Sequence, residues 1–63
     1  MKLNTIKILK EMVARGLVIE DLAEKIGKKP PALYALLSKK TTTLKTISLI
    51  GEALDIDPKD LLT

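Results

Sequence analysis

The sequence predicts an all-α domain of five short helices, on the basis of three observations. Apolar residues recur at helical spacing through most of the chain. Strand signals are weak, because there is no Asn-Gly or Asp-Gly turn and no sustained alternation of apolar and polar residues. Residues suited to helix starts and ends divide the chain at short intervals. A chain of 63 residues builds one core at most, so we expect a single domain over residues 1–63.

The first helix is expected over residues 5–14, with Asn4 as its N-cap. Gly16 supplies the left-handed residue that ends it. At about 100° per residue, one side of this helix is apolar, with Ile8 at the edge of that side. The residues on this side are Ile6, Leu9, Met12 and Val13.

Two further helices are expected over about residues 19–26 and 30–37. Gly27 stops the first of them, and the second starts at Pro30, because a missing N–H is no loss at the first helical position. Lys29 precedes a proline and is therefore biased away from the helical conformation. The residues expected in the core or at a close helix crossing are Leu22, Ala23, Ile26, Ala32, Leu33, Leu36 and Leu37.

A fourth helix is expected over residues 44–54, capped by Thr43 or Thr42. A fifth, of about five residues, follows Asp57 as its N-cap, with Pro58 at its first position. The inward face of the fourth helix is expected to hold Leu44, Ile47, Ile50, Ala53 and Leu54.

The composition excludes several classes of function. The chain has no Cys and no His, so a disulfide scaffold and the usual zinc sites are ruled out, and we expect no metal and no cofactor. Ser38 and Ser48 have no identifiable base beside them, so no enzymatic activity is expected. No apolar run approaches the roughly 20 residues that span a bilayer, and charges interrupt the N-terminal segment, so a cytoplasmic setting is expected.

The charges are strongly segregated along the chain. Between Glu24 and Glu52 there are six lysines and no acidic residue, a local charge of +6, whereas the remainder has five basic and eight acidic residues, hence −3. This distribution favours one face that meets a polyanion, although solvated lysines alone need no partner.

The stretch "DLAEKIGKKPPALYALLSKK", residues 21–40, resembles the helix-turn-helix of the phage repressor and Cro-like family. Upstream, "ARGLVIEDLA" fits the turn before the first of the two helices, and downstream "TLKTISLIGEALDIDPKDLL" resembles the end of such domains. The matching positions of the motif are Leu22, Ala23, Ile26, Gly27, Leu33, Leu36 and Ser38. The resemblance implies double-stranded DNA binding, a role in transcription regulation, and a recognition helix over about residues 30–37 that lies in the major groove.

The resemblance also assigns contact positions. In the family, residues at the start of the recognition helix face base edges, and the loop after it and the start of the next helix run along phosphates. The corresponding candidates are Lys28, Lys29, Pro30, Pro31, Tyr34, Ala35, Ser38, Lys39, Lys40, Thr41, Thr42, Thr43 and Lys45. Lys39 stands where the family commonly has Gly, and a left-handed turn there would cost about 1 kcal/mol.

The positions that should distinguish bases depart from the family pattern. Pro30, Pro31 and Ala35 stand where family members usually place polar side chains, and they favour apolar contact, for which the thymine methyl group is suited. Tyr34 would donate its hydroxyl to a base or a phosphate. In the alternative interpretation, the two prolines only stiffen the turn and Tyr34 packs against the edge of the core. Replacement of the whole polar set suits a redesigned scaffold as well as a divergent natural one.

One further departure concerns the start of the second helix, and another concerns stability. Val18 and Ile19 replace the polar cap and the phosphate-binding residue that commonly open the second helix, which leaves only backbone N–H groups there for a phosphate. Met12 and Leu37 occupy positions at which several family members hold a buried Arg–Glu pair, and an apolar pair avoids desolvating two charges.

Two questions about partners stay open at this level. A protein-interaction module on the same fold is the alternative function, with Val18, Ile19, Tyr34 and the prolines as an apolar patch. A homodimer on paired half-sites is an expectation that follows from the resemblance. Leu61 and Leu62 would either form its contact or close the core. A membrane-surface helix is not expected, because the chain has no Trp and no Phe to anchor it.

Overall fold

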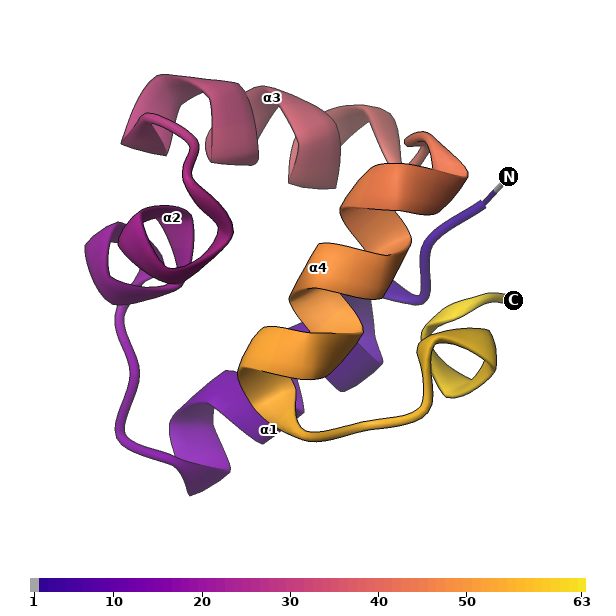
Figure 1. Ribbon diagram of the computed structural model, residues 1–63, viewed down its shortest axis with the longest axis horizontal. Helices are drawn as coiled ribbons and strands as arrows, with labels where there is room; N and C mark the ends of the chain where they lie inside the picture. The colour runs from indigo at the N-terminus through magenta and orange to yellow at the C-terminus, as the bar shows by residue number, and fades with distance from the viewer. Residues whose placement is uncertain (1) are drawn as a thin grey trace.

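The computed structural model describes residues 2–63 and consists of four α-helices and one turn of 3₁₀ helix (Figure 1). The elements are α1 (Thr5–Ala14), α2 (Ile19–Ile26), α3 (Pro30–Lys39), α4 (Leu44–Leu54) and η1 (Pro58–Leu61). The all-α class is confirmed, and the fifth helix is a four-residue 3₁₀ turn. No helix within residues 2–63 combines the length and apolar content needed to cross a membrane.

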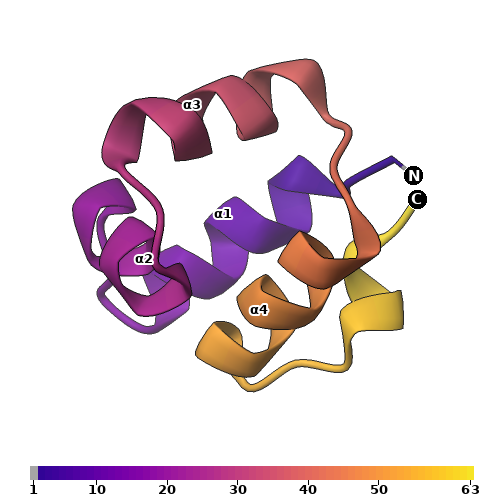
Figure 2. The same cartoon turned by 45° about the horizontal axis from the view of Figure 1, so that its top comes forward.

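The helices enclose one core, with α4 crossing in front of α1 in the view of Figure 1 and α3 running along one side of the domain in both views (Figure 1 and Figure 2). The segment that precedes α1, from Lys2, and the C-terminal turn lie side by side at one end of the domain (Figure 1 and Figure 2). Leu3 forms an isolated antiparallel bridge with Leu62, and the Asn4 N–H donates to the Leu61 carbonyl at 2.7 Å. The extended N-terminal segment is therefore fixed against the C-terminal turn.

Local signals set most helix boundaries. Asn4, Thr43 and Asp57 each accept a backbone N–H bond at the start of α1, α4 and η1, at 3.1, 3.3 and 3.1 Å. Gly16 and Gly27 adopt left-handed conformations with φ of 67° and 73° after α1 and α2. All five assignments confirm the prediction, because capping depends on residues no more than four positions apart.

Every element contributes to the core. Ala23 is completely buried and small, and it lies on α2, which packs against both α3 and α4. Leu61 is also completely buried and Leu62 is half-buried against the core, so the C-terminal leucines close the core. The buried apolar residues are Leu3, Ile8, Met12, Leu22, Ala23, Ile26, Leu33, Ile47, Ile50, Leu54 and Leu61. Leu36 and Leu37 pack against them as half-buried residues.

The orientation of α1 differs from the prediction. Ile8 and Met12 are its buried residues, whereas Ile6, Leu9 and Val13 are 66%, 46% and 79% exposed. The large apolar residues of α1 cover more than one face of the helix. Periodicity alone therefore cannot decide which of them the rest of the molecule covers.

Three smaller corrections concern α3 and α4. The helix α3 continues two residues beyond Leu37, so Lys39 is helical and Lys40 takes the left-handed position, with φ of 59°. Ala32 is exposed and does not lie at a helix crossing. Leu44, the first residue of α4, is 62% exposed and does not belong to the core.

Gly51 is buried in α4 at a close approach that the sequence did not signal. The Ile56 N–H donates to the Gly51 carbonyl at 2.8 Å, which brings the chain after α4 back against the helix. A Cβ atom at this position would lie 2.7 Å from the Ile56 carbonyl oxygen and 3.0 Å from Pro58 Cγ. The absence of a side chain therefore lets η1 pack against α4.

We expect Gly51→Ala to destabilise the domain, although alanine is the better helix former. The propensity gain of about 1 kcal/mol is opposed by overpacking against backbone, which costs about 1–3 kcal/mol and forces the following turn outward. Chemical denaturation measures the change in unfolding free energy. Ser48→Ala, at an exposed position of the same helix, is the control and should be neutral or slightly stabilising. If Gly51→Ala instead raised the unfolding free energy, the segment from Ile56 to Pro58 would be able to move away from α4 at little cost.

Candidate nucleic-acid interface

The outward face of α3 presents four predicted site residues as one stripe. Pro31, Tyr34, Ala35 and Ser38 are all exposed and follow the i, i+3, i+4, i+7 spacing of a single helix face. Leu33, completely buried, holds the opposite side of the helix in the core. Tyr34 is 56% exposed and is not among the residues that pack against the core, which favours ligand contact over the alternative in which it packs against the core edge.

The first turn of α3 offers no backbone hydrogen-bond donor to a ligand. Pro30 and Pro31 have no N–H. The N–H groups of Ala32 and Leu33 both donate to the Lys29 carbonyl, at 3.0 and 3.2 Å. An anion at this end of α3 would consequently have to bind lysine side chains.

Lysines flank the stripe at both ends. Lys28 and Lys29 precede α3, where Lys28 is half-buried and Lys29 exposed, and the exposed Lys39 and Lys40 end it. Ten helical residues separate the two groups by about 15 Å. This separation is comparable to the width of the DNA major groove, about 12 Å.

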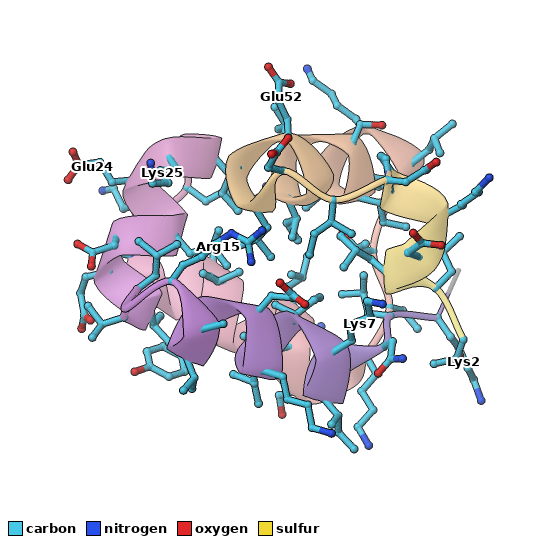
Figure 3. All side chains as sticks on the ribbon, turned by 90° about the horizontal axis from the view of Figure 1, so that it is seen from below. Lys2, Lys7, Arg15, Glu24, Lys25 and Glu52 are labelled. Atoms are coloured by element: carbon cyan, nitrogen blue, oxygen red, sulfur yellow. The ribbon has the colours of Figure 1, made fainter. Side chains whose placement is uncertain are left out.

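The N-terminal segment joins the lysines at the C-terminal end of α3. Lys2 forms an isolated antiparallel bridge with Thr41, and the Leu3 N–H donates to the Lys40 carbonyl at 2.8 Å. Lys2, Lys39 and Lys40 consequently border one surface hollow. In Figure 3, Lys2 projects from the end of the molecule where the terminal segments meet. Sequence reasoning missed Lys2, because only the tertiary pairing brings residue 2 beside residue 41.

The start of α4 supplies donors of a different kind. The Thr43 hydroxyl accepts the Thr46 N–H and donates to Thr46 Oγ1 at 3.1 Å, so this side chain serves as the helix cap. The first two N–H groups of α4, on Leu44 and Lys45, bond to no carbonyl within residues 2–63. Both residues are exposed, so backbone donors and the Lys45 ammonium group are available together at the positive end of a helix.

The start of α2 is unfavourable for an anion. Val18 has no side-chain acceptor for the helix, and the Asp21 carboxylate accepts the Val18 N–H at 3.2 Å. Glu20 adds a second carboxylate in the same turn. A phosphate bound to the backbone here, as the sequence suggested, would therefore meet two negative charges.

The lysines around α3 form no ion pair within residues 2–63. They are Lys28, Lys29, Lys39, Lys40 and Lys45. Within residues 2–63, the ion pairs join Arg15 with Glu11 and Lys59 with Asp57. Neither pair includes a lysine between positions 25 and 45. In Figure 3, Lys25 lies beside Glu24 on α2, seen from the side opposite α3. In the part of the chain that the structure describes, the lysines around α3 therefore have no carboxylate partner.

All the predicted site residues reach the surface. Lys28, Pro30 and Thr42 are half-buried and the others are exposed. The structure arranges them as the α3 stripe, a lysine pair before it, and a group formed by the loop and the α4 start after it. Their contacts with a ligand remain a prediction, and Lys2 and the Leu44 N–H are the groups that the sequence did not identify.

The helix-turn-helix geometry agrees with a comparison with known families. Residues 7–63 match the model of the Cro/C1-type HTH DNA-binding domain. No curated protein and no solved structure matches the chain. The matched range includes α2, α3 and the complete turn between them.

Proposed function

The chain belongs to the Cro/C1-type HTH DNA-binding domain family, and from this premise we propose how it holds double-stranded DNA. The helix α3 enters the major groove with its exposed stripe towards the base edges. Lysines at both of its ends and the start of α4 bind the phosphates of the two flanking strands. The observation that carries this proposal is the pair of uncompensated lysine groups about 15 Å apart along one exposed helix face.

The phosphate contacts are divided between side chains and backbone. The side chains are those of Lys28, Lys29, Lys39, Lys40 and Lys45, with Lys2 beside the last turn of α3. Ser38, Thr41 and Thr42 add hydroxyl groups. The capping role of Thr43 supports contact through the Leu44 and Lys45 N–H groups instead of its own hydroxyl. The location that goes with this function is the cytoplasm, as expected from the sequence.

A salt titration of duplex binding tests the proposal. Each neutralised phosphate contributes about 0.9 to the slope of log affinity against log salt. The six lysine contacts, that of Lys2 included, therefore predict a slope of about −5.4. Selection from random duplexes at two salt concentrations supplies the duplexes for this measurement. If no duplex of any sequence bound more tightly than about 10⁻⁴ M at low salt, where non-specific binding registers, DNA binding by this face would be excluded.

Protein interaction is the second candidate, because Val18 and Tyr34 are each 56% exposed. Ile19 is half-buried against the core, which reduces the apolar patch predicted for such a module. Reversing the charges of the lysines around α3 separates the two functions, since it would remove DNA binding and leave an apolar contact intact.

A homodimer on paired half-sites stays a prediction. The burial of Leu61 supports a role of the C-terminal turn in the core instead of in a subunit contact. Sedimentation of the free protein and of its complex with a two-site duplex measures the stoichiometry directly.

A further inference from the structure

The exposed stripe of α3 is almost devoid of groups that can distinguish bases by hydrogen bonding. Pro31 and Ala35 have no polar side-chain atom, and the first turn of the helix has no free N–H. Tyr34 and Ser38 each contribute one hydroxyl group, which donates and accepts equally well. The stripe carries no amide, carboxylate or guanidinium group, the groups that form paired bonds to guanine or adenine.

An apolar stripe still distinguishes one feature of the major groove. The C5-methyl group of thymine is the apolar element that the base pairs present there, and side chains such as alanine contact it. Opposite a proline ring or a methyl group, the guanine O6 and the cytosine N4–H₂ would lose water without gaining a partner. The polar groups of an A·T pair would lose water in the same way, so the C5-methyl group is the feature by which these side chains favour one pyrimidine over another.

We infer that α3 selects its sites by contact of Pro31 and Ala35 with C5-methyl groups of pyrimidines in the major groove. This inference rests on the proposed DNA binding. Pro31 and Ala35 are four residues apart, so they form one continuous surface over a turn of the helix. Tyr34 lies on the same face and extends this surface with its ring. Its hydroxyl forms a hydrogen bond with a neighbouring base or phosphate. The lysines set affinity and the methyl contacts set preference.

Replacing thymine with uracil tests the inference, because it removes the methyl group and leaves every hydrogen-bonding group in place. A selected duplex is prepared with deoxyuridine at single thymine positions within the site. At each contacted position we expect affinity to fall about fourfold, the fold-change that corresponds to one buried methyl-sized group. The salt slope should stay unchanged, since no phosphate contact is lost. Uracil outside the protected site should have no effect.

The converse substitution restores the methyl group. Where a contacted T·A pair is replaced by C·G, affinity should fall, and 5-methylcytosine at that position should recover part of the loss. On the protein side, Ala35→Gln should reduce the thymine-to-uracil affinity ratio at its contacted position to about one. Ala32→Gln, at an exposed position on the edge of the stripe, is the matched control and should keep the ratio. Circular dichroism establishes that both variants remain folded.

Two failures are distinguishable. If no duplex binds, the proposed function fails and the inference with it. If duplexes bind with a steep salt dependence but thymine and uracil forms bind equally at every position of the site, methyl recognition is overturned and DNA binding stands. If the thymine-to-uracil affinity ratio fell to about one in the Ala32→Gln control as well as in Ala35→Gln, the assignment to Pro31 and Ala35 would also be overturned.

Discussion

Replacing Lys28, Lys39 and Lys40 together with glutamate is expected to weaken DNA binding strongly while leaving the fold intact. All three side chains lie at the ends of α3, and none of them forms an ion pair within the part of the chain that the structure describes. Two unit charges about 4 Å apart in water interact by about 1 kcal/mol, so each reversal changes the energy by about 2 kcal/mol before screening. The expected loss of affinity is roughly 100- to 10,000-fold at low salt.

The control for this experiment must change the net charge by the same amount. Lys7, Lys10 and Lys25 lie outside the proposed interface and form no ion pair within residues 2–63, so their replacement with glutamate provides this control. Fluorescence anisotropy with a labelled duplex at several salt concentrations measures both affinity and slope. In the variant changed at Lys28, Lys39 and Lys40, the slope of log affinity against log salt should become about three units less steep. In the control variant this slope should change little. Equal losses in both variants would mean that only the net charge attracts the duplex.

Truncation of Leu33 is expected to have the largest effect on stability. Leu33 is the completely buried residue of α3 and so fixes this helix against the core. Leu→Ala changes at buried sites cost about 2–5 kcal/mol, and a domain of 63 residues stands near the lower end of globular stability. We therefore expect Leu33→Ala to be largely unfolded at moderate temperature and to lose DNA binding through the loss of α3.

Leu44→Ala is the matched control for Leu33→Ala. The chemical change is identical, but Leu44 is 62% exposed, so the expected effect is within about 0.5 kcal/mol. Thermal and urea denaturation followed by circular dichroism give both values. A similar loss of unfolding free energy in Leu33→Ala and Leu44→Ala would contradict the assignment of Leu33 to the core.

Much of the interface could be predicted because its residues are consecutive in the chain. Helical spacing from Pro30 places Tyr34 and Ala35 on one face once Leu33 is assigned to the core. The segregation of lysines is equally visible in the sequence. The roles of individual donors were less predictable. Thr43 can either cap a helix or meet a phosphate, and the structure assigns its hydroxyl to the cap.

The sequence by itself determined most helix boundaries and the position of the lysines around α3. Asn4, Gly27, Pro30 and Thr43 act on the backbone within one helical turn, so their effects are independent of the rest of the molecule. The charge of each segment likewise follows directly from the residues that it contains. These features are local, which is why they follow from the amino-acid order alone.

The tertiary structure decided which surfaces face inward and which distant groups meet. It buried Ile8 and left Val13 exposed, and it set η1 against Gly51. It also brought Lys2 beside the end of α3. Each of these outcomes depends on contacts between segments far apart in the chain. Their free energy comes from the burial of shared surface, which no single segment contains.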